Sequence, residues 1–156
     1  DVKPASARAP PGSVGSGMRM TIGARTYDLA TRALVVSDDL FTFAAAGDEA
    51  ALERALAGGA DLVRLAEPTP AMLARCASAG VSVMVPPSAL ATAQAAGLPS
   101  DRIVPDTLLL DVTGSECPIA ATAVGVVRGA RIVRTDDVRG ARRICDVLAA
   151  VLEARR

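Results

Sequence analysis

Short apolar segments alternate with helical segments along this chain, and this alternation limits the fold more than any other feature of the sequence. Short strands separated by helices that end at glycine are typical of a parallel α/β sheet. Residues 108–112 either continue a strand beyond a kink at Pro105 or form a separate strand. The predicted strands are 33–37, 62–66, 81–85, 102–104 and 130–134, and the predicted helices are 47–56, 70–80, 88–96, 118–129 and 137–156.

The beginning of the chain differs from the rest. Residues 1–17 are rich in Pro, Gly, Ser and Ala, which bury little surface, so we predict that they are disordered. Residues 18–27 have the spacing of a short hairpin that would cover one end of the domain. Ser88 is expected to cap the helix at 88–96, and Asp136 or Asp137 the last helix. We therefore expect a single α/β domain over residues 18–156.

The composition excludes several classes of function. The chain has 156 residues, no histidine, and 17 basic residues balanced by 17 acidic ones. Without histidine there is no imidazole for acid–base catalysis or metal binding, and the only lysine is Lys3 in the tail. Zero net charge and 2% aromatic residues argue against a nucleic-acid partner. No apolar run is long enough to span a bilayer, so no membrane association is expected.

Three cysteines are widely spaced and odd in number, so we expect reduced, structural thiols in a cytoplasmic protein. They are Cys76, Cys117 and Cys145.

Parallel strands present their ligands at the carboxyl ends of the strands, so the polar residues that follow each predicted strand are the candidate site. Arg134 is the strongest candidate, because a guanidinium at a strand end binds phosphate or carboxylate in bidentate fashion. The alternative is an ion pair with Asp136 or Asp106. The candidate ligand-binding residues are Ser37, Asp38, Glu67, Asp106, Arg134 and Asp136.

Two adjacent carboxylates, Asp38 and Asp39, follow the first predicted strand. Hard oxygen ligands of this kind could hold Mg²⁺, and a solvated turn is the alternative interpretation. No other cofactor is indicated.

The last strand also carries a resemblance to a known family. Residues 129–138, Gly-Ala-Arg-Ile-Val-Arg-Thr-Asp-Asp-Val, are similar to the closing strand of dihydropteroate synthases, whose pattern is Gly-Ala-Arg-Ile-(Leu/Val)-Arg-Val-His-Asp-Val. Residues 19–40, 58–65 and 96–106 also resemble segments of that family. The resemblance implies a TIM barrel that condenses a pterin pyrophosphate with p-aminobenzoate in folate biosynthesis, assisted by Mg²⁺.

The chain departs from this family at the positions that carry its chemistry. Asp136 stands where the resemblance expects a histidine that holds the pyrophosphate, and Met84 where it expects a carboxylate. The Asn-containing loop after the first strand and the Ser-Arg-Lys turn have no counterparts. Asp106 aligns either with the pterin-binding aspartate of the fifth strand or with a position after the fourth strand, where Pro105 would replace the pterin-contacting asparagine.

The length limits the architecture. A complete barrel of this type needs about 200 residues or more. Two to three β–α units are therefore expected to be missing from the middle, leaving a shortened, TIM-barrel-like (β/α) fold. The alternative is an open, five-stranded, doubly wound sheet.

Three functions follow from the resemblance. The first is a degenerate dihydropteroate synthase-like protein, a pseudoenzyme that binds a pterin or phosphate-type ligand or a partner subunit. The second is an active dihydropteroate synthase-like transferase with an altered site. The third is a structural partner, in a homo-oligomer or with a paralogue, that completes a barrel. The missing lysine and histidine favour a protein without catalytic activity.

Overall fold

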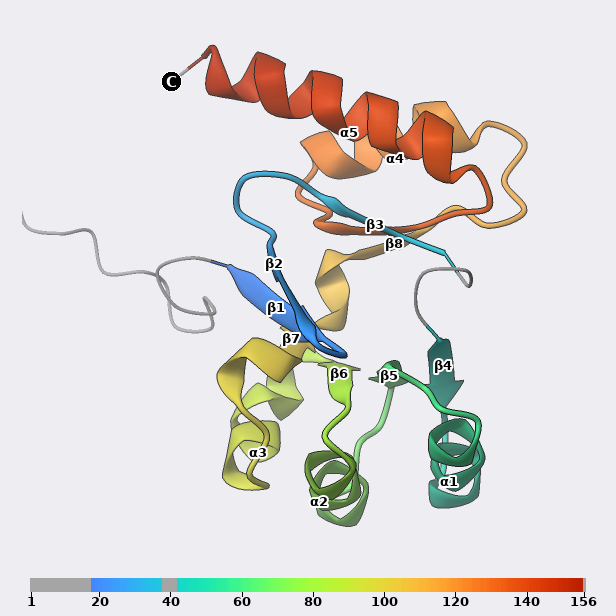
Figure 1. Ribbon diagram of the computed structural model, residues 1–156, viewed down its shortest axis with the longest axis vertical. Helices are drawn as coiled ribbons and strands as arrows, with labels where there is room; N and C mark the ends of the chain where they lie inside the picture. Colours follow the sequence, from blue (N-terminus) through green and yellow to red (C-terminus); the bar gives the residue numbers. More distant parts are fainter. Residues whose placement is uncertain (1–17, 38–41, 156) are drawn as a thin grey trace, which may run out of the picture.

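Seven parallel strands form two separate sheets in the computed structural model, which describes residues 18–37 and 42–155 (Figure 1). The three-stranded sheet has the order β3 (Leu34–Val36), β9 (Ile132–Arg134), β8 (Leu109–Asp111). The four-stranded sheet has the order β4 (Phe43–Ala46), β5 (Leu62–Leu65), β6 (Ser82–Val85), β7 (Ile103–Pro105). In the described residues no backbone ladder joins the two sheets. The barrel is therefore shortened and not closed.

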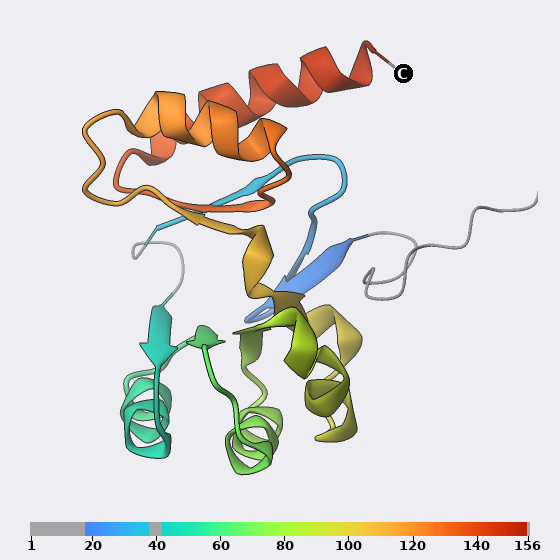
Figure 2. The same ribbon diagram turned by 180° about the vertical axis from the view of Figure 1, so that it is seen from behind.

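Helices cover the outer face of each sheet, as Figures 1 and 2 show from opposite sides. The helices α1 (Glu49–Ala57), α2 (Pro70–Ala79) and α3 (Leu90–Ala95) pack on the four-stranded sheet. The helices α4 (Pro118–Val127) and α5 (Val138–Glu153) pack on the three-stranded sheet. Single turns of 3-10 helix lie at η1 (Pro87–Ala89), η2 (Ser100–Arg102) and η3 (Asp106–Leu108).

Local sequence signals explain where most helices begin. The side chains of Asp48, Thr69 and Asp137 cap α1, α2 and α5 by accepting a hydrogen bond from a backbone N–H in the first turn. Gly80 ends α2 in the left-handed conformation, at φ 68°, which a glycine adopts without steric cost. The predicted cap at Ser88 is wrong: α3 starts from η1 without a side-chain cap.

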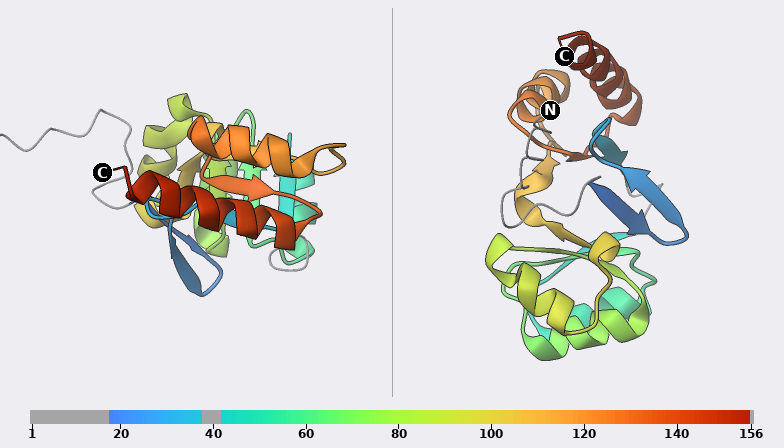
Figure 3. Two further views of the ribbon diagram at one scale, coloured as in Figure 1. Left: turned by 90° about the horizontal axis from the view of Figure 1, so that it is seen from above. Right: turned by 90° about the vertical axis from the view of Figure 1, so that its left-hand side faces the viewer.

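A β-hairpin closes the amino-terminal end of the space between the sheets, as the sequence predicts. It consists of β1 (Arg19–Ile22) and β2 (Arg25–Asp28). The Ser82 hydroxyl at the start of β6 donates to the backbone carbonyl of Thr21. The Thr21 hydroxyl donates to Asp101 Oδ2 at 2.6 Å. These hydrogen bonds join the hairpin to the amino-terminal ends of β6 and β7 in the four-stranded sheet (Figure 3).

Strand alternation divides the core into three clusters. Two of them lie between a sheet and its helices. The third lies between the sheets and the hairpin, and every member is at most 2% exposed. Its buried members are Met20, Ile22, Leu29, Val36, Leu62, Met84, Val104 and Ile132. Successive strand residues face opposite sides, so this interior receives every second side chain of each strand.

The structure adds one strand to the predicted set and decides two alternatives that the sequence left open. Residues 43–46 form a strand, β4, that the sequence does not reveal, because Phe-Ala-Ala-Ala has little β-branched character. Residues 103–105 and 109–111 are separate strands in different sheets, joined by η3. The doubly wound alternative is wrong, because each sheet has helices on its outer face only and its other face lines the shared interior.

No helix in residues 18–37 or 42–155 has both the length and the apolar character needed to cross a membrane. The prediction for residues 1–17 lies outside the described residues.

The three thiols differ in their surroundings. Burial raises the pKa of the Cys76 thiol to about 11, despite the opposing effect of Arg75. Burial, with a smaller contribution from Asp146, also raises the pKa of Cys145. Cys117 is exposed. Cys76 and Cys145 are therefore buried thiols whose thiolate forms are disfavoured.

We expect a single thiol of the folded protein to react with Ellman's reagent at pH 8, because the thiolate is the reactive form. A spectrophotometric titration should count one thiol per chain before unfolding and three in guanidinium chloride. The Cys117→Ser variant should show none until it unfolds. A second thiol that reacts rapidly in the folded protein would contradict this assignment.

Candidate functional site

Two arginines and two aspartates face the interior at the carboxyl ends of the strands. Arg134 ends β9 and is in register with Val36 on one side and Asp111 on the other. Arg64 lies on β5 in register with Met84, which is part of the interior cluster. Alternation places these side chains on the face that the apolar interior residues share. We call Arg64, Asp106, Asp111 and Arg134 the charged set.

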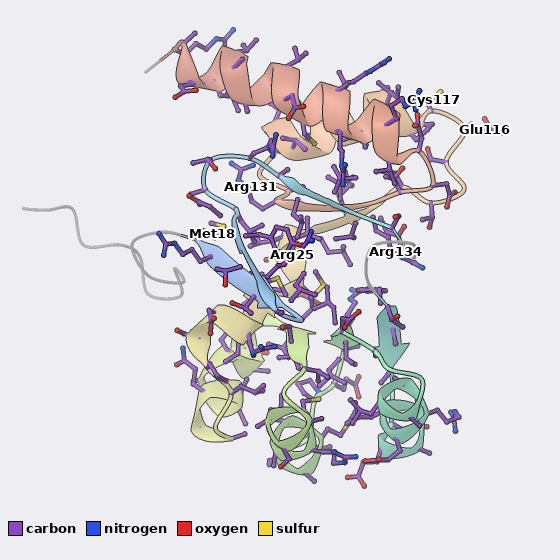
Figure 4. The ribbon with its side chains drawn as sticks, in the orientation of Figure 1. Met18, Arg25, Glu116, Cys117, Arg131 and Arg134 are labelled. Carbon is purple, nitrogen blue, oxygen red and sulfur yellow. The ribbon has the colours of Figure 1, made fainter. Side chains whose placement is uncertain are left out.

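Arg134 contacts both sheets. Its Nη1 atom donates to Asp111 Oδ2 at 3.0 Å, within its own sheet. Its guanidinium carbon lies 5.0 Å from the centre of the Phe43 ring, at the start of β4. A cation at this distance from an aromatic face is attracted to it. Arg134 therefore lies where the two sheets approach each other, and Figure 4 shows it beside β4.

Asp111 is a site residue that the sequence analysis did not single out. Its partial burial opposes ionisation, but hydrogen bonds from the Thr113 hydroxyl and backbone N–H, and the Arg134 guanidinium, outweigh burial and lower its pKa. The expected partners of Arg134 were Asp136 and Asp106; among the residues that the structure describes, Arg134 forms an ion pair with Asp111. The sequence feature that could have identified Asp111 is its position near the end of the predicted strand segment 108–112. Its pairing with Arg134 depends on strand register, which that feature does not give.

Asp106 pairs with Arg64 instead. Arg64 Nη2 lies 3.6 Å from Asp106 Oδ2, and the Asp106 side chain is 17% exposed. Asp106 begins η3, directly after β7, at the carboxyl end of the four-stranded sheet. Asp106 and Arg134 thus belong to different ion pairs on different sheets. The functional role predicted for each stays a prediction.

The other predicted residues have distinct surroundings. Ser37 follows β3, and its hydroxyl oxygen is buried without a hydrogen-bond partner in the described part of the chain. Asp136 Oδ2 accepts a hydrogen bond from the Gly114 N–H at 2.9 Å, which joins the two loops after β8 and β9. Glu67 is exposed in the turn after β5. Asp38 and Asp39, the predicted Mg²⁺ ligands, lie outside the described residues.

Among residues 18–37 and 42–155, no three His, Cys, Asp or Glu side chains are grouped closely enough to hold a metal ion.

A cavity of about 650 Å³ lies away from the charged set, between the hairpin, β3 and α5. Its walls include Tyr27, Arg32 and Arg142. No helix stands between β3 and β4 in the described residues, so this flank of α5 is uncovered. The cavity contains none of the predicted site residues, and we assign it no role in the site.

We expect Asp111 to stabilise the fold above its ordinary pKa and to lose that contribution in acid. A pKa lowered by folding gives stability that is complete above about pH 4 and disappears as the pH falls through the pKa of the folded state. The Asp111→Asn variant should be less stable than wild type at pH 7 by less than about 1 kcal/mol, since solvent screens the pair. Urea unfolding at pH 7 and pH 3 measures this difference. A difference that persists undiminished at pH 3 would refute the assignment.

Comparison with known proteins identifies solved structures that share this fold. No protein-family model and no curated protein match the sequence. A crystal structure of dihydropteroate synthetase with product matches at a TM-score of 0.62 and 14% identity, over 89% of this chain and 100% of that chain. The 7,8-dihydropteroate synthase of Vibrio fischeri ES114 matches at 0.63 and 14% identity, over 86% and 98%. Yersinia pestis dihydropteroate synthase with a pterine–sulfa conjugate matches at 0.60 and 13% identity, over 86% and 99%. At these identities the likeness establishes the fold, so the chain has a dihydropteroate synthase-like fold in a shortened form whose barrel is not closed.

Proposed function

We propose that this protein is a degenerate dihydropteroate synthase-like protein that binds a pterin bearing a phosphate group, without catalysing its condensation. The observation that carries the proposal is the charged set, in which two arginines and two aspartates face one interior at the carboxyl ends of the strands. Barrels of this type bind their ligands at that end. The similar solved structures include one with a product and one with a pterine–sulfa conjugate.

The zero net charge of the charged set favours a ligand that carries both N–H donors and an anionic group. Two guanidinium groups and two carboxylates sum to zero, so a simple anion would have to compete with Asp111 for Arg134. A pterin carries N–H donors that suit a carboxylate, and its phosphate suits a guanidinium. The buried Ser37 hydroxyl beside this end of β3 offers a further polar contact that no described residue uses.

The missing catalytic groups support binding without turnover. The chain contains no histidine, and its only lysine is Lys3. Asp136 stands where the resemblance expects the histidine that holds the pyrophosphate, so a group that would stabilise the charge of a departing pyrophosphate is missing. The hydrogen bond from Gly114 to Asp136 keeps that carboxylate at the loop ends.

We expect isothermal titration calorimetry to detect binding of a pterin pyrophosphate to the whole chain, with inorganic pyrophosphate at least about tenfold weaker because it leaves the carboxylates unused. The Arg134→Ala variant should lose about 10- to 100-fold in affinity, the range expected for a charge-assisted hydrogen bond. The Arg54→Ala variant, which removes an exposed arginine from α1, is the matched control and should bind as wild type. No heat at millimolar pterin pyrophosphate, with folded protein, would reject the ligand.

Catalysis is tested separately. We expect this chain not to rescue growth of a strain that lacks dihydropteroate synthase. Rescue would reject the non-catalytic assignment and favour the altered-enzyme alternative, in which Arg134 and Asp106 would still hold the substrate.

The unclosed barrel favours a second candidate function. In the described residues, β8 and β3 are the edges of one sheet and β4 and β7 the edges of the other. Unpaired strand edges are relieved by association with another chain. A partner or paralogue that supplies strands at the η3 junction would complete the barrel. Binding of such a partner would make the charged set part of a shared interior.

A further inference from the structure

Two cavities adjoin each other along the flank of α5 that is turned toward the hairpin. The first is the cavity of about 650 Å³ between the hairpin, β3 and α5. The second, of about 120 Å³, lies further toward the carboxyl end of α5. Thr31, Arg32, Ala33 and Cys145 line both, so the two cavities form one groove, which we call the α5 groove. Its volume is in the range of sites that hold small molecules.

The path of the chain explains why this groove is open. The segment 29–33, which joins β2 to β3, passes beneath α5 (Figures 1 and 3). β3 is an edge strand of its sheet, and no helix stands between it and β4 in the described residues. This flank of α5 is therefore without a neighbouring helix in the part of the chain that the structure describes.

One end of the groove is charged. Arg142 and Asp146 lie one turn apart on α5, and Arg32 Nη1 donates to Asp146 Oδ1 at 2.7 Å. Asp28 Oδ1 accepts a hydrogen bond from the Ala30 N–H at 2.9 Å, which holds the turn after β2. Arg142 is exposed and forms no ion pair within residues 18–37 and 42–155. An anion can therefore bind Arg142 without displacing a carboxylate.

The other end of the groove is apolar. Val126 of α4 and Ala33, just before β3, are 5% and 7% exposed, whereas Leu152 in the last turn of α5 is 39% exposed. Cys145, which is 2% exposed, lies between the two ends. Leu152 follows Arg142 by ten positions, which is about 15 Å along the helix. The groove thus joins a cation to a partly uncovered apolar surface.

Two charged residues border the apolar end without offering an anion site there. Arg131 Nη1 donates to the backbone carbonyls of Val126 and Ala130 at 3.3 and 2.9 Å, so this guanidinium is directed at the backbone. Glu153, the last residue of α5, is exposed, and its carboxylate repels a second negative group. An anionic group is therefore favoured only at the Arg142 end.

We propose that the α5 groove binds a small amphipathic carboxylate, with its carboxylate at Arg142 and an unbranched hydrocarbon tail that passes over Cys145 toward Leu152. A guanidinium binds a carboxylate through two parallel N–H···O bonds. The tail removes Leu152 from water, and this apolar burial favours binding. A single negative charge fits better than a dianion, because Asp28 and Asp146 lie at the same end. The groove is separate from the charged set, and the proposal does not depend on a pterin ligand.

Isothermal titration of the whole chain with octanoate tests the ligand. Octanoate should bind at least about tenfold more tightly than acetate, which lacks the tail, and than 1-octanol, which lacks the charge. Octyl phosphate should bind more weakly than octanoate. Failure of millimolar octanoate to bind would overturn the proposal. Equal affinity for octanoate and 1-octanol would overturn the role of Arg142, and tighter binding of octyl phosphate would overturn the choice of a carboxylate.

Variants of exposed α5 residues locate the site. Arg142→Ala should weaken octanoate binding about tenfold and leave 1-octanol binding unchanged. Arg143→Ala, which removes the next exposed arginine, is the matched control and should bind octanoate as wild type does. Leu152→Asp should weaken both ligands at least about tenfold, because it adds a charge at the apolar end. Ala150→Asp, on an exposed position outside the groove, should weaken neither. Equal losses in a variant and its control would overturn the site.

Amide chemical shifts of ¹⁵N-labelled protein separate this groove from the charged set. Octanoate should shift the signals of Ala33, Cys145 and Ala149, which line the groove. Shifts confined to Asp111 and Arg134 would place octanoate in the charged set and overturn the proposal. The outcome is independent of the calorimetric test with a pterin pyrophosphate, so either proposal can fail while the other holds.

Discussion

The packing of one apolar interior holds the two sheets of this protein together. In the described residues no strand ladder connects the sheets, so backbone hydrogen bonds stabilise each sheet but not their union. Val36 and Ile132 from one sheet meet Leu62, Met84 and Val104 from the other, each at most 2% exposed. Burial of one such side chain contributes about 1.5–3 kcal/mol. A few of them together match the net stability of a typical domain.

The charged set depends on the same alternation that builds the interior. A side chain two residues beyond an interior position returns to the interior, so the strand that buries Ile132 must also turn Arg134 inward. The same holds for Leu62 and Arg64 on the other sheet. Arg134, whose side chain is 26% exposed, then needs a carboxylate, because a partly buried charge without a partner is costly, whereas Arg64 is 44% exposed and pairs at the surface. Asp111 meets that need, and Asp106 is the partner of Arg64.

The short connection η3 explains why the carboxylates lie where they do. It joins β7 to β8 within one turn, and these two strands belong to different sheets. Asp106 therefore follows the last strand of one sheet and Asp111 ends a strand of the other, although only four residues lie between them. Each meets an arginine of its own sheet. A full β–α unit at this place would have carried the two carboxylates to strand ends further apart along the barrel wall.

Much of the fold was determined by the sequence alone, because its signals are local. A cap such as Asp137, helix-ending glycines such as Gly80, and apolar runs such as 62–65 act within a few residues, and they predicted the helices and most strands. The resemblance also predicted the shortened, barrel-like architecture. The strand at 43–46 was missed because alanine carries little local preference for a strand.

Only the tertiary structure decided which charges meet. The pairing of Arg134 with Asp111 depends on the register of β8 against β9, and the contact with Phe43 on the approach of two sheets. Strand register and sheet packing depend on contacts between side chains that are far apart in the sequence. No local sequence pattern predicts those contacts. The same reason applies to the exposed side of α4. Its apolar composition is visible in the sequence, but only the packed structure shows which half of the helix the three-stranded sheet leaves uncovered.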